Sequence, residues 1–429
     1  MERGGILYQK TTLKNGLRVL TSYMPHTHSV CVALFIGIGS RYESTAEAGT
    51  SHFIEHISFR GTPDHPTSRD ISEAIEGVGG ILNGATDKEL TFYWCKVSCD
   101  HFATAAGVLA DMLLNSKFEA QDIEKERQVI IEEIHMCKDS PSQQVGLLID
   151  DLLWPEHPLG RDVAGSKETV SAIDRKSLLS FMNLNYTPQN TLIAVTGNIE
   201  EAAALETVEK LLGGWFNSAP RPVYSTFYEK SGPRLKIEKR DTEQAHLCLA
   251  LPGISLLDPR RFHLDLLNVI LGEGMSSRLF AEIRDKMGLA YGISSYVDHF
   301  LDCGSLIVAA SVDPSNLNKT VKAIIGQLHL LKDEIPEAEM RKAREISKGR
   351  LMLRMEDSRN VAGWLGGQEM LAGRILTLEE VVEAIDGIQI SDLQQMAREM
   401  VVDEKMRLAV VGPVKSETAL KKILKIEEG

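Results

Sequence analysis

Two histidines and a glutamate in one short segment have the types and spacing of a metal-dependent hydrolytic site. His52 and His56 are four residues apart, and Glu55 directly precedes the second histidine. A helix advances about 100° per residue, so these three side chains share one face, opposite Phe53 and Ile54. Two imidazoles at this spacing can bind one zinc ion. The glutamate could then take a proton from a water molecule that the metal activates.

A chain with 12 histidines can carry such a pair by chance on a surface helix, so the prediction depends on a third ligand. Glu126 and Glu133 are seven residues apart and share a helical face with Val129 and Ile130. Acidic helices are usually solvated, but a carboxylate on an apolar stripe needs compensation, which a metal would provide. Glu132 falls on a more polar face. We therefore favour Glu133 over Glu132 as the third ligand, with Glu126 orienting a histidine or the water.

The composition limits the partners and the compartment. The 429 residues carry a net charge of −13, which argues against nucleic acid or an anionic membrane as a partner. Residues 1–5 lack the apolar core of a signal peptide, and the apolar run at residues 30–38 is too short to span a bilayer. The six cysteines include no CxxC pair, which favours isolated thiols over a disulfide framework. We expect a cytoplasmic protein that does not enter a membrane.

The chain is predicted to be a tandem repeat of one α/β unit of about 200 residues. Residues 192–197 and 408–412 end in Gly197 and Gly412, at an offset of 215 residues, and residues 32–34 match 247–249 at the same offset. Residues 216–234, with three prolines, indicate a linker. This gives an N-terminal zinc-binding domain at 1–215 and a C-terminal homologous domain at 235–429. The second copy lacks the HxxEH pattern, so the metal belongs to the first repeat.

These features, with others along the chain, resemble the pitrilysin-type inverzincin peptidases, and most of all their bacterial branch that is similar to mitochondrial processing peptidase. The resemblance runs from about residue 10 to 415 and rests on the following segments: His52-Phe53-Ile54-Glu55-His56, Phe59-Arg60-Gly61-Thr62, Gly79-Gly80, Leu82-Asn83, residues 126–130, Glu132-Glu133, residues 274–280, Arg284 and residues 288–291. It implies an α+β fold in which two homologous domains, each a mixed sheet covered by helices, form half of a clamshell chamber.

The resemblance implies roles for the residues at the metal. His52, His56 and Glu133 match the ligands of one zinc ion per chain. Glu55 matches the general base, and Glu126 matches a second acidic position that supports activity. The loop at residues 63–69 looks one residue longer than the family pattern. Counting from the second histidine would therefore select Glu132 as the third ligand, whereas the local motif selects Glu133.

The resemblance also implies a substrate path. Asn83 and Ala85 match an edge strand that binds the substrate as an added strand, and Arg284 and Tyr291 match a pair that contacts the substrate backbone near the scissile bond. Without the resemblance, the arginine would be interpreted as a surface salt-bridge residue and the tyrosine as a packing ring. Relatives usually carry Ala and an aromatic residue in the middle of the segment that is Asn83-Gly84-Ala85-Thr86 here. This departure predicts a more flexible edge strand and a different substrate preference.

The leading hypothesis is a zinc endopeptidase that cuts short or unfolded polypeptides inside a dimer chamber. A homodimer is expected, and a heterodimer with a non-catalytic homologue is the alternative assembly. A rival hypothesis is a non-catalytic subunit of a processing-peptidase-like complex, and a third is a metal-binding chaperone that holds peptides without cutting them. Because a dead subunit would have lost His52, Glu55, His56 or the distal glutamate, the intact set favours the enzyme.

Overall fold

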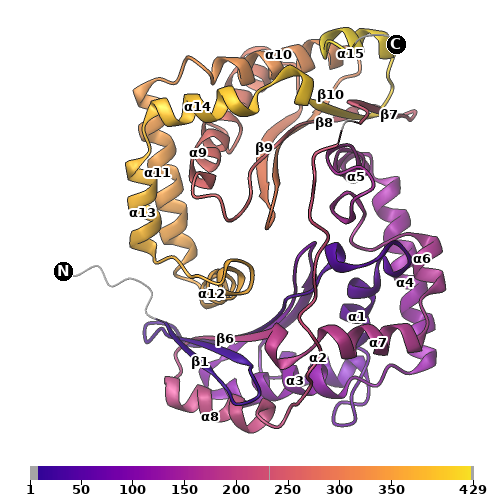
Figure 1. Ribbon diagram of the computed structural model, residues 1–429, viewed down its shortest axis with the longest axis vertical. Coiled ribbons are helices and arrows are strands. Elements are labelled where there is room, and N and C mark those ends of the chain that lie inside the picture. The colour runs from indigo at the N-terminus through magenta and orange to yellow at the C-terminus, as the bar shows by residue number, and fades with distance from the viewer. Residues whose placement is uncertain (1–7, 231, 427–429) are drawn as a thin grey trace. The chain divides into compact units, whose positions relative to one another are not determined.

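The computed structural model describes residues 8–230 and 232–426 (Figure 1). Residues 1–5, which are predicted to lack a signal core, lie outside this part. The described chain forms two compact units. Unit 1 comprises the described parts of residues 1–134, 161–225 and 352–378, and unit 2 comprises those of residues 135–160, 226–351 and 379–429. Each unit therefore takes a segment from the other half of the sequence.

The sheet of unit 1 runs in the order β1-β2-β6-β3-β5-β4. Its strands are β1 (Gln9–Thr12), β2 (Arg18–Tyr23), β3 (Ser29–Ile36), β4 (Ile81–Thr86), β5 (Thr91–Ser98) and β6 (Thr191–Gly197). The apolar strands β3 and β6 are buried almost throughout, as expected for central strands covered on both faces. In contrast, β4 lies at the edge and is half exposed.

Helices cover both faces of this sheet. They are α1 (Thr50–Ser58), α2 (Ser68–Glu76), α3 (Phe102–Asn115), α4 (Ala120–Asp139), α6 (Lys167–Ala172), α7 (Arg175–Asn185), α8 (Glu201–Leu212) and α12 (Ser358–Ala372). On α1, the side chains of Phe53, Ile54 and Ile57 are fully buried in the core of the unit. The predicted division of this helix into an apolar face and a polar face therefore holds.

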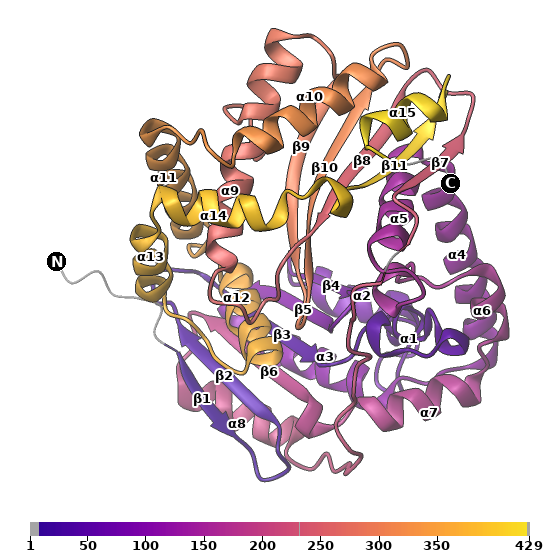
Figure 2. The ribbon, with the colours of Figure 1, turned by 45° about the horizontal axis from the view of Figure 1, so that its top comes forward.

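Helix α12 comes from the second half of the chain and packs on β3 and β6 (Figure 2). Gly366 allows this close approach, because a Cβ at that position would collide with the ring of Phe35. The buried carboxylate of Glu369 pairs with Lys10 and Arg18, with N–O distances of 2.6 and 3.2 Å. Helix α12 is thus an integral layer of unit 1.

Unit 2 repeats this architecture without the metal motif. Its strands are β7 (Leu235–Lys239), β8 (Ala245–Pro252), β9 (Gly292–His299), β10 (Gly304–Val312) and β11 (Arg407–Gly412). Its helices are α5 (Pro141–Leu153), α9 (Arg261–Leu271), the π-helix η6 (Leu279–Lys286), α10 (Leu317–Leu330), α11 (Glu337–Arg354), α13 (Leu378–Gly387), α14 (Ile390–Met400) and α15 (Glu417–Ile423). Helix α11 ends in residues that belong to unit 1, just as α4 ends in residues that belong to unit 2.

The two sheets confirm the predicted tandem repeat. The order β2-β6-β3-β5-β4 in unit 1 corresponds to β7-β11-β8-β10-β9 in unit 2. In each, the first pair is parallel and the others are antiparallel. Helix α5 packs on β8 and β11 as α12 packs on the equivalent β3 and β6. The predicted linker at 216–234 divides the chain by sequence repeat, and this division stays a prediction. The compact units differ from the sequence repeats, because α5 belongs to unit 2 and α12 belongs to unit 1.

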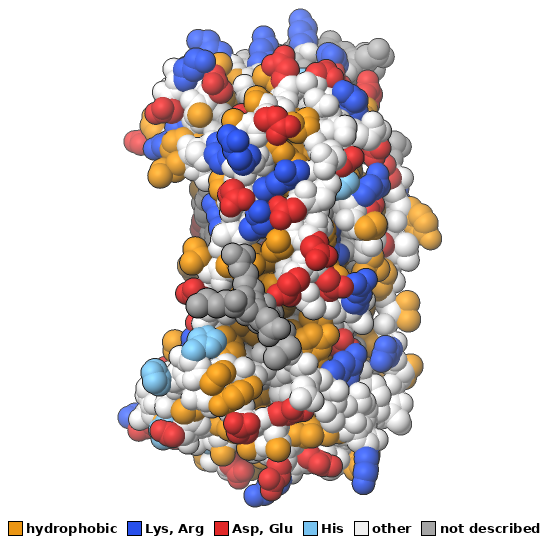
Figure 3. Space-filling model, turned by 90° about the vertical axis from the view of Figure 1, so that its left-hand side faces the viewer, with side chains coloured by type: hydrophobic (Ala, Val, Ile, Leu, Met, Phe, Trp, Pro, Cys, Tyr) orange, Lys and Arg blue, Asp and Glu red, His pale blue; other side chains and the backbone are white. Residues whose placement is uncertain are grey.

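Two further features concern membrane-spanning helices and the distribution of surface charge. Among the described residues, no helix combines the length and the apolar character needed to cross a membrane. On the face drawn in Figure 3, acidic and basic side chains are interspersed rather than gathered into a field of one sign. Such a face does not offer the continuous basic patch that nucleic acid or an anionic membrane attracts.

Candidate metal and active site

The first turn of α1 is fixed by a carboxylate that the sequence analysis did not identify. Glu43 is 2% exposed and accepts hydrogen bonds from the backbone N–H groups of Gly49 and Ser51, at 2.8 and 2.7 Å. Burial raises the pKa of the Glu43 carboxyl, against the opposing effect of these hydrogen bonds. A carboxylate at a helix N-terminus satisfies orphan donors and complements the helix dipole. Glu43 therefore holds the end of the helix from which His52 projects.

The donor atoms of His52, His56 and Glu133 converge on one point. His52 Nε2 and His56 Nε2 are 3.2 Å apart, and Oε2 of Glu133 lies 3.9 and 3.4 Å from them. Within the described residues, these three form a group able to hold a metal ion. Two imidazole nitrogens and one carboxylate oxygen are the donor set of catalytic zinc sites. The chemistry of this set therefore fits the ion that the sequence predicts.

Two further observations bear on this donor set. Burial, and to a lesser extent the neighbouring His56, lowers the pKa of His52 to about 4. The imidazole of His52 is therefore neutral at physiological pH, as a zinc ligand must be. The structure brings Glu133 to the histidines, while Glu132 is exposed on the same helix. The geometry thus supports the favoured glutamate over its neighbour.

Glu126 lies behind His56, as hypothesised from the sequence. Its side chain is almost fully buried, and its Oε2 is 2.9 Å from His56 Nδ1. Its other oxygen forms an ion pair with Arg60. When Nδ1 donates to this carboxylate, Nε2 keeps its lone pair for the metal. Glu126 can therefore select both the tautomer and the orientation of the His56 ring.

Glu55 is held next to these ligands by the edge strand β4. The hydroxyl of Thr86 donates a hydrogen bond to Glu55 Oε2 over 3.0 Å. Burial raises the pKa of the Glu55 carboxyl, against the effects of His56 and this hydrogen bond. A Cβ at Gly84 would lie 3.2 Å from Oε1 of Glu55 and 3.1 Å from the ring of Phe59. Glycine at this position therefore leaves room for the glutamate, because a Cβ there would make tight contacts with both side chains.

Asn83 and Ala85 lie on β4, next to α1, in register with Trp94 and Phe92 of β5. In the described sheet, β4 pairs with β5 along one side and is the last strand of the order. Its other side therefore presents backbone donors and acceptors that an extended peptide could pair with. The Asn83 side chain accepts a hydrogen bond from the N–H of Gly84 at 2.8 Å, which orders this strand locally.

Arg284 and Tyr291 lie together in unit 2. Arg284 Nε donates a hydrogen bond to the carbonyl of Tyr291 over 2.9 Å, and its guanidinium lies 4.4 Å from the centre of the Phe280 ring. The Tyr291 side chain is 60% exposed, so it is not a packed ring. Within the described residues no carboxylate forms an ion pair with this arginine, so the salt-bridge interpretation does not apply. Both side chains come from η6 and the loop after it.

The fold and the site define a two-repeat α/β protein with one inverted HxxEH site, in its first repeat. Comparison with known protein families agrees with this description. The family model described as insulinase, peptidase family M16, matches residues 18–167, and the model described as the inactive domain of peptidase M16 matches residues 172–347. The chain belongs to peptidase family M16, which confirms the resemblance to pitrilysin-type peptidases. The model for the inactive domain covers much of the repeat that lacks the metal motif.

Individual relatives span nearly the whole chain. An uncharacterized zinc protease of Mycobacterium leprae is 37% identical over 97% of this chain and 94% of its own length. One of Bacillus subtilis is 34% identical over 95% and 98% of the two chains. The crystal structure of a protease from Helicobacter pylori matches with a TM-score of 0.89 at 24% identity, and covers 96% of this chain and all of that one. This last likeness concerns the fold.

Proposed function

We propose that the protein is a zinc endopeptidase that hydrolyses short or unfolded polypeptides. The observation that carries this proposal is the convergence of His52, His56 and Glu133 beside Glu55, whose carboxylate is held by Thr86. A surface helix that carried two histidines by chance would need none of these partners. The names of the relatives as zinc proteases support the same activity.

The residues of the site have separate roles in the proposed hydrolysis. Zinc held by His52, His56 and Glu133 would supply Lewis-acid chemistry, which lowers the pKa of a water molecule and polarises a carbonyl group. Glu55 takes the proton of that water as it attacks the scissile carbonyl, and then delivers it to the leaving nitrogen. The Glu55 carboxyl must hold this proton between the two transfers. Glu126 keeps His56 in place throughout.

The edge strand indicates the substrate class. A peptide that pairs with the outer side of β4, near Asn83 and Ala85, must be extended and must have free backbone groups. Short peptides and unfolded chains meet this requirement, and stably folded proteins do not. We propose that Arg284 and Tyr291 contact the substrate backbone and stabilise the developing oxyanion. We further propose that the working form is a dimer whose chamber excludes bulk water from the site.

The test is metal analysis combined with cleavage of a quenched-fluorescence peptide library, with and without a chelator. The expected result is about one zinc per chain, cleavage that a chelator abolishes and zinc restores, and no cleavage of a stably folded protein. Full activity in chelator, or efficient digestion of a folded protein without unfolding, would contradict the proposal. Zinc binding without any cleavage would favour the peptide-holding chaperone or the non-catalytic subunit instead.

A further inference from the structure

The segment Phe59-Arg60-Gly61-Thr62 is one of those that carry the family resemblance, but it has no role in the mechanism above. It directly follows α1, and Arg60 N donates a hydrogen bond to the carbonyl of Ile57 over 3.0 Å. The guanidinium of Arg60 pairs with Oε1 of Glu126, whose Oε2 faces His56 Nδ1. One carboxylate thus has a different partner at each oxygen.

Arg60 places a positive charge against this buried carboxylate. Glu126 is 3% exposed, and an ionised carboxylate at such a position is costly unless it is paired. His56 does not supply a countercharge when it serves as a neutral zinc ligand. Arg60 offers that countercharge, through the ion pair of its guanidinium with Oε1 of Glu126.

The residues after Arg60 form a closed turn. The N–H of Thr62 donates to the carbonyl of His65 over 2.8 Å, and the N–H of His65 donates back to Thr62 Oγ1 over 2.9 Å. Gly61 has a φ of 140°, and a Cβ there would collide with the carbonyl of Pro66. Only glycine takes up this conformation without strain. The turn is therefore a defined structure rather than a loose connection.

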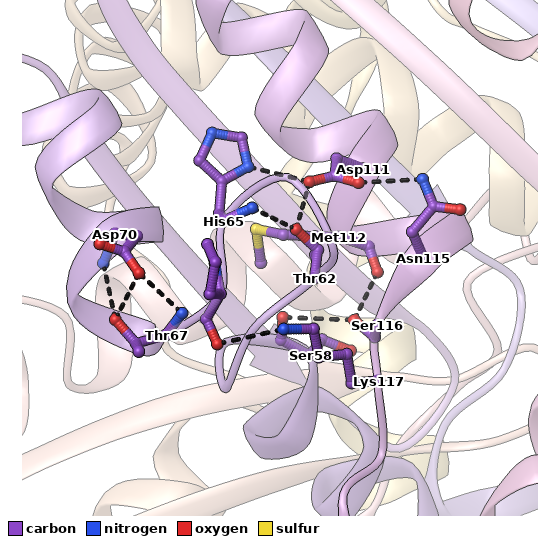
Figure 4. Close-up of polar contacts among 11 residues, drawn as sticks. Ser58, Thr62, His65, Thr67, Asp70, Asp111, Met112, Asn115, Ser116 and Lys117 are labelled. Carbon is purple, nitrogen blue, oxygen red and sulfur yellow. Dashed lines mark hydrogen bonds and ion pairs between the residues drawn. The ribbon is translucent and has the colours of Figure 1, made fainter.

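Asp111 on α3 anchors this turn, as Figure 4 shows. The hydroxyl of Thr62 and Nδ1 of His65, the latter at 2.9 Å, both contact Asp111 Oδ2. Asn115 donates to Oδ1, also at 2.9 Å. Asp111 is 7% exposed and Thr62 is fully buried. The backbone of Arg60 is therefore held on one side by α1 and on the other by a turn that is fixed to α3.

We propose that Arg60 is a positioning residue of the metal site, which fixes the Glu126 carboxylate and through it the ring of His56. The inference rests on the zinc site of the proposed function. The alternative is a purely structural ion pair, because the Arg60 side chain is 31% exposed and such pairs often contribute little. The two interpretations predict different results when the arginine is replaced. Only the loss of a positioning residue would weaken zinc binding.

The experiment measures the zinc dissociation constant by competition with a chelator, in zinc-free protein reloaded with zinc alone. Arg60→Gln should weaken zinc binding roughly tenfold, and Arg60→Lys should restore most of the loss because it keeps the charge. The control is Arg69→Gln, which removes an exposed arginine that pairs with Glu73 on α2, and it should leave the constant unchanged. Melting temperatures of the zinc-free variants show whether the fold itself has changed.

A double-mutant cycle with Glu126→Gln decides whether Arg60 acts through that glutamate. If it does, Arg60→Gln should change zinc affinity less than about twofold in a chain that already carries Glu126→Gln. Fully additive losses, or unchanged affinity in the Arg60→Gln single variant, would overturn the inference and leave the proposed function standing. A wild-type chain that binds no zinc would overturn both.

Discussion

Thr86 Oγ1 lies 3.0 Å from Glu55 Oε2 and donates a hydrogen bond to it. The two residues are 31 positions apart in the sequence, and they belong to the edge strand β4 and to the helix α1. The strand that we propose to bind the substrate therefore also positions the proposed general base. A peptide that pairs with β4 would come to lie beside a carboxylate that is already oriented.

Replacing Thr86 tests this relationship. Thr86→Val keeps the shape of the side chain but removes its donor, and hydrogen bonds to charged groups contribute about 1.5–3 kcal/mol. We expect kcat to fall about tenfold or more, with little change in zinc content. Thr86→Ser should recover most of the rate. An equal loss in both variants would point to packing of β4 rather than to the hydrogen bond.

Glu55→Gln separates the base from the ligands. The substitution removes a proton acceptor and leaves His52, His56 and Glu133 intact. Zinc content, measured by metal analysis, should stay at the wild-type level, while peptide hydrolysis should fall by at least about 100-fold. Full turnover in a variant that had lost its zinc would show that the roles are wrongly assigned.

The two adjacent glutamates of α4 give a matched pair of variants. Glu133→Gln should weaken zinc binding strongly, because a neutral amide is a poor replacement for a carboxylate ligand. Glu132→Gln removes the same charge from the same turn of the same helix and should have little effect. Titration with a chelator measures both, and the reverse order would identify Glu132 as the ligand.

The stability of the metal-free chain should depend on pH through His52. Its pKa is about 4 in the folded protein, lowered by burial and then by His56, and about 6.5 in an unfolded chain. Between these values the unfolded chain binds more protons, so stability is full above about pH 6.5 and falls as the pH drops towards 4. Urea unfolding should show a loss of up to about 3 kcal/mol. The slope should shrink in His52→Gln, and an unchanged slope would assign it to other groups.

Arg284 and Tyr291 are predicted to act in trans, on the zinc site of a partner copy. Glu55→Gln chains and Arg284→Ala chains should each be nearly inactive alone. A mixed dimer would contain one composite site with Glu55 from one chain and Arg284 from the other, so activity should return in part. Mass spectrometry can verify that subunits exchange. Exchange without recovery would mean that each site is completed within its own chain or by a different partner.

The HxxEH helix and the tandem repeat are predictable because their signals are local or periodic. The spacing of His52, Glu55 and His56 places them on one face of any helix, and the buried positions of β3 and β8 recur at a fixed offset. The third ligand cannot be assigned from local spacing alone. Glu132 and Glu133 are neighbours, so only the packing of α4 in three dimensions decides which of them faces the histidines.

The supporting residues are not predictable in this way. Glu43, Thr86 and Arg60 reach the site from three separate segments, and nothing in their local sequence indicates the partner that each one holds. Residues 141–153 are a different case. They carry no predicted element, although Val145, Ile149 and Leu152 have helical spacing and are buried in α5. The helical spacing of these residues is visible in the sequence. Their packing on β8 and β11, which belong to the other half of the sequence, is not.

The exchange of α5 and α12 has a consequence for the order in which the protein can be completed. The strands of unit 1 are all made once residue 197 has left the ribosome, but the helix that covers β3 and β6 ends only at residue 372. Until then the apolar face around Phe35 has no cover and is exposed to unwanted contacts. Unit 1, although its strands are encoded first, therefore lacks a complete cover until residue 372 has been made.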